Sequence, residues 1–247
     1  MNWWAILLIG AGVGFLGGLF GKGGSAVATP LLHAVGVPAI VAVAAPLPAT
    51  IPSTLAATWA YWRERLVDDQ VLRWSLAFGI PATALGALAT RWISGGVLVE
   101  ATDIIVAGLG LRFLLKPNET EITDEMPSHY GLRLALVASV VGVAAGLLAN
   151  SGGFLLAPLY LAVLRLPIKA SFATSLAVAA VLAVPGTIVH TALGHVNWSI
   201  VVVFGAASVP LSYVGARVAL RTHGQLLERA YGGVLAVLGL SLLLTSL

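Results

Sequence analysis

Two glycine-rich runs carry the residues best suited to ligand chemistry in this sequence. The first run is Gly21-Lys22-Gly23-Gly24-Ser25 and the second is Asn150-Ser151-Gly152-Gly153. Glycine lets the backbone turn sharply and lets its N–H groups come close to a ligand. Lysine, asparagine and serine add further hydrogen-bond donors. Together these groups suit the binding of an anion, and we take all nine as candidate substrate-binding residues.

The two runs belong to one duplicated pattern. Duplicated halves with matching Gly and Pro interruptions point to the substrate site of a transporter. Glycines four residues apart also suit close helix packing, so we expect the glycines ahead of each run to form a packing seam. The equivalent residues, each pair 128 positions apart, are Gly14 and Gly142, Gly18 and Gly146, Gly24 and Gly152, and Pro30 and Pro158.

Each run is predicted to interrupt a membrane helix that restarts directly afterwards. We expect the new helices to begin at Ser25 and Gly153 and to direct their N-termini, each worth about half a positive charge, toward a shared centre. Unpaired N–H groups at such ends bind anions, and Lys22 would add a full charge where the second copy has Asn150. Two alternatives stay open: the glycines can serve packing alone, and Lys22 can reach the cytoplasmic surface instead.

Hydroxyl side chains form a second candidate group in the first half. Prolines at 46, 48 and 52 remove three backbone donors from one membrane segment, so we predict that this segment is not a regular helix. Thr50, Ser53 and Thr54 are expected to donate to the freed carbonyl groups. The segment either lines the substrate cavity, with Thr50 and Ser53 binding substrate, or forms a static kink that these hydroxyls repair.

Thr174 and Ser175 are the matching hydroxyl pair in the second half. Hydroxyls donate hydrogen bonds to an oxyanion without holding it as tightly as a full positive charge would. We therefore include both as candidate substrate-binding residues. The alternative is that each hydroxyl bonds to a carbonyl one turn earlier in its own helix.

His190 is the candidate for proton coupling. It lies late in the predicted segment 168–192, where an ionisable side chain marks function by default, and histidine titrates near neutral pH. The alternative is an interfacial histidine with no role in transport. The apolar segments offer no paired carboxylates and no histidine cluster, and the chain has no cysteine. We therefore expect no catalytic site, no metal and no cofactor.

The elements that must position these residues are membrane helices. The chain of 247 residues is 59% hydrophobic and 9% charged, whereas soluble domains carry about 25% charged residues. Uncharged stretches long enough to cross a bilayer recur along it. The N-terminus lacks the basic stretch and cleavage site of a signal peptide, so we expect it to be the first membrane segment.

The sequence predicts an all-α polytopic membrane protein built from two inverted repeats of about five helical segments each, with glycine-rich helix breaks near the midplane. An odd number of segments in the first half inverts the second half. We assign 1–116 to the first membrane repeat, 117–130 to a cytoplasmic linker and 131–247 to the second repeat. The ten predicted apolar segments are 3–20, 26–36, 38–62, 74–91, 97–115, 131–149, 154–164, 168–192, 197–216 and 228–246.

The basic residues set the orientation. If both termini lie outside the cytoplasm, all but one of the 13 Lys and Arg residues fall on cytoplasmic turns or flanks, and Arg91 alone falls outside. This bias follows the positive-inside rule. We therefore expect a multi-pass protein of the cell (inner) membrane with both termini outside the cytoplasm.

The paired breaks, each followed by Pro-Leu, resemble the TauE/SafE family of sulfite and organosulfur anion transporters. The stretches 166–176 and 190–198 carry the same resemblance, which covers essentially the whole chain. It implies transport of a small sulfur-containing anion such as sulfite or a sulfonate. Where the family repeats the Thr-Ser pair of Thr174 and Ser175 in its first half, this chain has Ala45-Pro46, which predicts a differently shaped first-half wall.

These observations predict a secondary transporter that moves sulfite, or an organosulfonate such as sulfoacetate, by alternating access. The substrate would be held between the two broken-helix N-termini. A passive anion channel and a carrier for small carboxylates are the alternatives, and an enzyme lacks an evident catalytic group. The expected partners are the small anion and the lipid bilayer, with no nucleic acid. The coupling ion (a proton or sodium), the direction of transport and a homodimer stay open.

Overall fold

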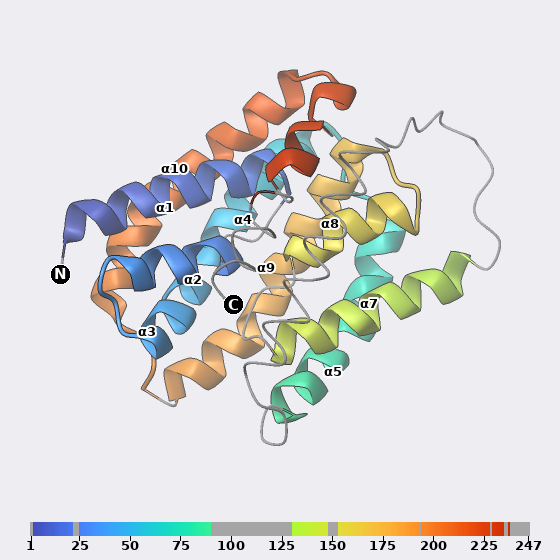
Figure 1. Ribbon diagram of the computed structural model, residues 1–247. Coiled ribbons are helices and arrows are strands. Elements are labelled where there is room, and N and C mark those ends of the chain that lie inside the picture. Colours follow the sequence, from blue (N-terminus) through green and yellow to red (C-terminus); the bar gives the residue numbers. More distant parts are fainter. Residues whose placement is uncertain are drawn as a thin grey trace.

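The computed structural model describes residues 2–21, 25–89, 130–147, 153–192, 194–227, 229–234 and 237. The predicted segment 97–115, the linker up to 129 and most of the last predicted segment lie outside these residues. The regular elements of the described part are helices (Figure 1). They are α1 (Trp3–Leu19), α2 (Ser25–Ala34), α3 (Ala39–Ala44), α4 (Pro46–Arg63), α5 (Asp69–Ala89), α7 (Tyr130–Leu147), α8 (Gly153–Ala162), α9 (Ile168–Ala192) and α10 (Trp198–Arg221).

Several of these helices are suited to a bilayer. Among the described residues, four stretches are long and apolar enough to cross a membrane: Ile40–Arg63, which joins α3 and α4, and the helices α7, α9 and α10. The helix α1 is apolar but shorter. The prediction of an all-α polytopic membrane protein is therefore confirmed. The inverted relation of the two halves, the domain bounds and the orientation of the termini stay predictions.

Helix α5 begins earlier than predicted, at Asp69 rather than at residue 74. The Asp68 carboxylate accepts a hydrogen bond from the backbone N–H of Val71 (2.8 Å). An aspartate before the first turn satisfies N–H groups that have no partner inside the helix. The polar residues that end the apolar pattern thus form the first turn of α5.

The proline-rich segment is a helix, so the prediction of irregular backbone there is wrong. Pro46 and Pro48 lie in the first turn of α4, where the N–H groups that proline lacks would have no partner in the helix. Helix α4 then continues through Pro52. Thr50 donates to the carbonyl oxygen of Pro46 (2.9 Å) and Thr54 to that of Thr50 (2.8 Å). The carbonyl group that Pro52 leaves without a helix donor is that of Pro48, and none of these hydroxyls bonds to it. The hydroxyls instead share carbonyls one turn earlier in the same helix, so the predicted repair of freed carbonyls is wrong.

Glycines make the closest contacts between helices. A Cβ atom added at Gly14 or Gly18 would collide with the backbone of α10, so these two helices approach backbone to backbone. In the second half, a Cβ added at Gly142 would lie 2.6 Å from the carbonyl oxygen of Gly79 in α5. Close approach of this kind is typical of small residues in membrane helices. The predicted packing seam is confirmed at these positions.

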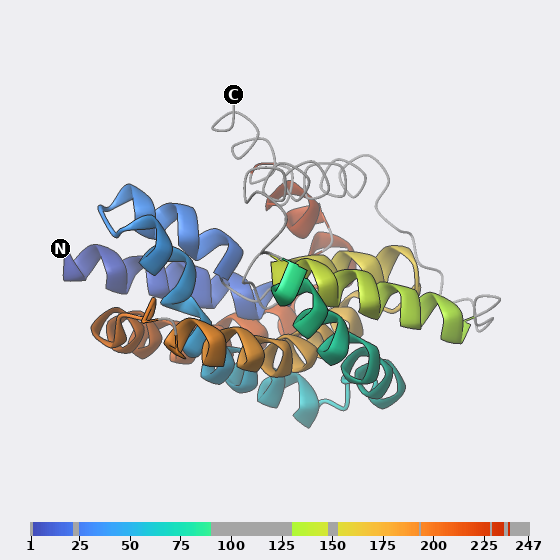
Figure 2. The same cartoon turned by 90° about the horizontal axis from the view of Figure 1, so that it is seen from below.

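The first helix of each half packs against a late helix of the other half. Helix α1 lies along α10 and α7 lies along α5, while α4 and α9 pack against each other (Figure 1, Figure 2). Gly215 meets the backbone of Phe15, and Gly86, which is 129 positions before Gly215, meets that of Val143, 128 positions after Phe15. This exchange of partners is what a pseudo-two-fold relation between the halves predicts.

Replacing Gly14 with alanine should destabilise the protein, because the new Cβ would meet the backbone of Ser208. Overpacking of this kind costs about 1–3 kcal/mol. Gly12 on the same helix is the matched control, because no atom of the described residues lies within 4 Å of its added Cβ. Thermal unfolding in detergent should give a lower Tm for Gly14→Ala and no loss for Gly12→Ala. Equal shifts would contradict the packing seam.

Candidate functional site

The helices that follow the two glycine runs begin where the sequence predicts. Helix α2 starts at Ser25 and α8 starts at Gly153, which is buried. The remaining predicted site residues of the runs lie outside the described residues, and their substrate-binding role stays a prediction. These are Lys22, Gly23, Gly24, Asn150, Ser151 and Gly152.

Gly21 is fixed as glycine by two independent constraints. Its φ angle of 64° lies in the left-handed region, which residues other than glycine rarely adopt. A Cβ added there would also lie 2.6 Å from the Cβ of Phe172 in α9. Gly21 therefore turns the chain directly against α9 at the start of the first break.

Hydroxyl groups from two other helices hold this break. Tyr61 of α4 donates to the carbonyl oxygen of Gly18 (3.0 Å), and Ser175 of α9 donates to that of Gly21 (2.7 Å). Both side chains are fully buried. The last carbonyl groups of a helix have no partner within it, and away from water each must be satisfied by the protein. The described start of the first glycine break, from Gly18 to Gly21, is therefore held by α4 and α9.

Thr174 and Ser175 engage the protein backbone in this structure. The Thr174 hydroxyl accepts a hydrogen bond from the N–H of Asp68 (3.0 Å), in the turn before α5. The Ser175 hydroxyl also lies 3.0 Å from the carbonyl oxygen of Phe172, three residues earlier. The pair thus positions the first break and the turn before α5. A direct contact with substrate stays a prediction for both.

A small cavity, which we call the hydroxyl cavity, lies between α1, α4 and α10. Ser53 and Ser208 face each other across it with their hydroxyl oxygens 2.8 Å apart, and Ser212 donates to the carbonyl oxygen of Ser53 (2.9 Å). Its volume is about 10 Å³, which holds about one water molecule. The lining residues are Val13, Gly14, Gly17, Thr50, Ser53, Thr54, Phe204, Ser208 and Ser212.

The hydroxyl cavity suits a ligand that accepts hydrogen bonds. None of its lining residues is charged, and its five hydroxyl side chains are buried. Each hydroxyl can donate one hydrogen bond, but in this structure they donate to carbonyls or to one another. The cavity is too small for a sulfite or sulfonate group. Such a ligand therefore enters only if α1, α4 or α10 moves, and the hydroxyls then turn from the backbone to the ligand.

The structure brings some of the predicted hydroxyls together and adds others. Thr50 and Ser53 line the hydroxyl cavity, whereas Thr174 and Ser175 do not. Substrate binding by Thr50 and Ser53 stays a prediction. The sequence interpretation missed Ser208 and Ser212. Their spacing of four residues, which places them on one helix face, is the only sequence signal for the pair. The contact of that face with Gly14 appears only in the structure.

His190 lies near the end of α9, outside the hydroxyl cavity. Its Nδ1 atom is 3.3 Å from the Nδ1 atom of His195 in the following turn, and both rings are half-buried. One of the two nitrogens must carry the proton for this contact to be a hydrogen bond. Proton coupling through His190 stays a prediction. No group of three metal-ligating side chains occurs among the described residues.

Comparisons with known proteins agree on a membrane transporter. The profile of the family described as Sulfite exporter TauE/SafE matches residues 6–242. Probable membrane transporter protein YjnA of Bacillus subtilis (strain 168) is 25% identical over 254 residues, which cover 97% of this chain and 99% of that protein. A probable membrane transporter protein of Xylella fastidiosa (strain Temecula1 / ATCC 700964) is 28% identical, covering 92% of this chain and 90% of that protein. No solved structure matches the chain significantly.

Replacing Tyr61 with phenylalanine should destabilise the protein by about 1–3 kcal/mol, because the buried carbonyl group of Gly18 loses its donor. Tyr213 of α10 is the matched control, since its hydroxyl makes no hydrogen bond to the described residues. Thermal unfolding in detergent should show a lower Tm for Tyr61→Phe than for Tyr213→Phe. A wild-type Tm for Tyr61→Phe would mean that the break does not depend on this bond.

Proposed function

Because this chain belongs to the TauE/SafE family, we propose that it is a secondary transporter for a small sulfur-containing anion. The transported anion is sulfite or an organosulfonate such as sulfoacetate, and it crosses the cell membrane by alternating access. The family and the names of the relatives support transport in general. The substrate and the mechanism are the proposed part.

The hydroxyl cavity carries this proposal. Its wall combines α1 and α4 of the first half with α10 of the second half. A site that both halves share opens or closes when one half moves against the other, which is the basis of alternating access. Gly17 of α1 lines the cavity and comes four residues before Gly21, where the first break starts. The proposal places the bound substrate between this cavity and the helix that restarts at Ser25.

Sulfite and sulfonate groups fit the chemistry of this site. Each presents three oxygens, and the cavity offers several hydroxyl donors from two helices, among them Thr50, Ser53 and Ser208. The lining hydroxyls are neutral, so the negative charge needs a further partner. The N-termini of α2 and α8 and the side chain of Lys22 would supply it. A coupled proton, with His190 as its carrier, or a sodium ion would reduce the net charge that moves.

The closed hydroxyl cavity favours a carrier mechanism over a channel mechanism. The hydroxyl cavity holds about one water molecule and is enclosed by buried side chains. A channel in its conducting state needs a continuous wet path through the bilayer, and a carrier needs only a site that opens to one side at a time. A small carboxylate could accept hydrogen bonds from the same donors, but it has two oxygens where a sulfite or sulfonate group has three.

Counterflow in proteoliposomes tests this function. Vesicles preloaded with unlabelled sulfite or sulfoacetate should accumulate the radiolabelled anion transiently, because a carrier exchanges substrate across the membrane. Sulfate, thiosulfate, taurine, acetate and chloride complete the panel. Conductive flux without counterflow would establish a channel, and counterflow restricted to acetate would replace the sulfur anion by a carboxylate.

Replacing Ser208 with alanine should impair transport more than stability. Loss of one hydrogen bond to a charged ligand costs about 1.5–3 kcal/mol, which raises KM about ten- to hundredfold. Thr83→Ala is the matched control, because Thr83 is a buried hydroxyl of α5 that bonds to Gly79 and does not line the cavity. Uptake by proteoliposomes measures both variants, with Tm as the check on folding. Wild-type KM in Ser208→Ala would remove the hydroxyl cavity from the substrate path.

A further inference from the structure

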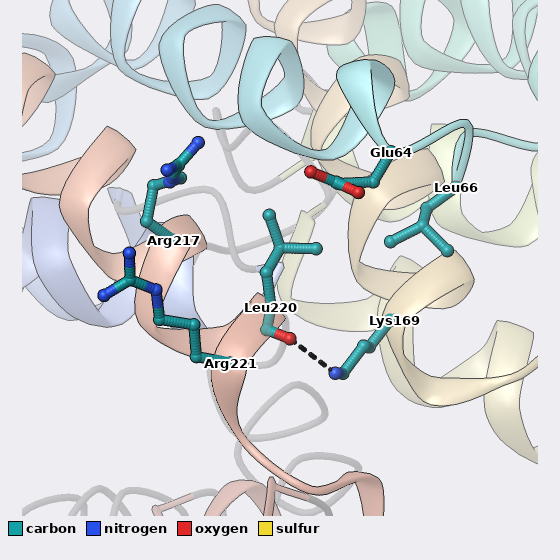
Figure 3. A pocket seen from close by; sticks show the side chains of 6 residues that line it. All are labelled: Glu64, Leu66, Lys169, Arg217, Leu220 and Arg221. Atoms are coloured by element: carbon teal, nitrogen blue, oxygen red, sulfur yellow. Dashed lines mark hydrogen bonds between the residues drawn. The ribbon is translucent and has the colours of Figure 1, made fainter.

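A larger pocket lies where α4 and α10 end and α9 begins (Figure 3). Its volume is about 410 Å³, so a sulfite or sulfonate group fits without any movement of helices. We call it the basic pocket. Its lining residues are Glu64, Leu66, Lys169, Arg217, Leu220 and Arg221.

The positive charges of the basic pocket have no carboxylate partner among the described residues. Three lining side chains are cationic and one, Glu64, is anionic, so the formal charge is +2 (three minus one). Within the described part of the chain, no carboxylate oxygen lies within 4.0 Å of Lys169, Arg217 or Arg221. A concave surface with an excess of one charge attracts counter-ions.

The two arginines of the basic pocket supply donors suited to an oxyanion. Arg217 and Arg221 are four residues apart on α10 and so share one helix face, where like charges repel each other. The C-terminal end of α10 offsets part of this cost, because its dipole favours cations. An oxyanion between the arginines would remove the remaining repulsion. Guanidinium groups present paired N–H donors that match two oxygens of such a group.

Lys169 completes the pocket from a different helix. It lies in the first turn of α9, where the dipole disfavours a cation, yet its ammonium group reaches across to the carbonyl oxygen of Leu220 (2.8 Å; Figure 3). The ammonium group has three donors, so this bond leaves two for a ligand. The contact places the third positive charge beside the arginine-bearing end of α10.

The basic pocket lies in line with the hydroxyl cavity along the same helices. On α10, Arg217 follows Ser212 by about 7.5 Å of helix rise (five residues at ~1.5 Å each). On α4, Glu64 follows Ser53 in the same direction. Tyr61 and Ala216, both fully buried, occupy the layer between the two sites. A movement of α4 against α10 that opens the hydroxyl cavity would act on this layer.

We propose that the basic pocket is a second oxyanion-binding site, which receives the sulfite or sulfonate group of the transported anion before it enters the hydroxyl cavity. This inference deepens the proposed function and rests on it for the identity of the ligand. Arg217, Arg221 and Lys169 bind the anion's oxygens. Glu64 lowers the affinity, so that the anion is released toward the cavity instead of being trapped.

A phospholipid phosphate presents the same oxyanion chemistry as a sulfonate. The two sources are separable, because a lipid headgroup is bound from the bilayer and a transported anion from water. Binding of a soluble anion to the purified protein in detergent, without added lipid, measures the site's affinity for the transported anion. Native mass spectrometry measures how much phosphatidylglycerol stays bound to the protein, and so tests binding of the lipid headgroup.

Opposite charge changes should have opposite effects on binding. The probes are sulfite, sulfoacetate and inorganic phosphate, and the readout is thermal stabilisation of the purified protein at low salt as each anion is titrated. Arg217→Gln should raise the half-saturating concentration about three- to tenfold, and Glu64→Gln should lower it by a similar factor. Both effects should shrink at high salt. Arg63→Gln is the matched control, because Arg63 is exposed at the end of α4 and does not line the pocket.

Each pattern of results either supports or contradicts binding of the transported anion in the basic pocket. Opposite shifts for Arg217→Gln and Glu64→Gln, with none for Arg63→Gln, would support the basic pocket. Loss of phosphatidylglycerol from Arg217→Gln without a change in anion binding would overturn the assignment to the transported anion. Unchanged binding in both charge variants, while Ser208→Ala still lowers uptake, would overturn this inference and leave the proposed function standing. Absence of counterflow with every anion of the panel would instead overturn the proposed function.

Discussion

A helix can be broken inside a membrane protein only where its freed carbonyl groups find donors in the protein or line a water-filled cavity, and this constraint organises the structure. Tyr61 and Ser175 supply those donors at Gly18 and Gly21. They come from α4 and α9, which pack against each other. The break therefore cannot move independently of these two helices. Any movement of α4 that enlarges the hydroxyl cavity must carry the end of α1 with it or break the bond to Gly18.

The glycine contacts join the two halves of the chain. Backbone-to-backbone packing of α1 on α10, and of α7 on α5, makes each pair span both halves of the sequence. Ser53 of α4 and Ser208 of α10 meet across a further contact between the halves, so the proposed substrate site lies on a boundary between halves. The basic pocket continues along the same α4–α10 boundary. On the proposed path, an anion meets fixed positive charge first and neutral hydroxyl donors second.

The sequence alone predicted the helix restarts at Ser25 and Gly153, because glycine runs and hydrophobic length are local signals. It also predicted the packing seam at Gly14, Gly18 and Gly142. It failed at Pro46, because the sequence shows a missing donor but not that the first turn of a helix leaves that donor unused. Partners distant in the sequence were equally hidden. The sequence around Ser208 does not show that it faces Ser53. Nor does it show that Lys169, Arg217 and Arg221, which the positive-inside rule accounts for, line one pocket.

The most direct test of the central claim is the accessibility of the hydroxyl cavity during transport. The chain contains no cysteine, so Ser208→Cys introduces a single thiol that reports without background. In proteoliposomes, a small alkylating reagent should modify this thiol as the cavity opens, and sulfoacetate or another anion that gives counterflow should slow the modification. Ser199→Cys, exposed at the start of α10, should react at the same rate with and without the anion. A folded Ser208→Cys variant that stays unmodified, or that reacts equally fast with the transported anion present, would contradict the account.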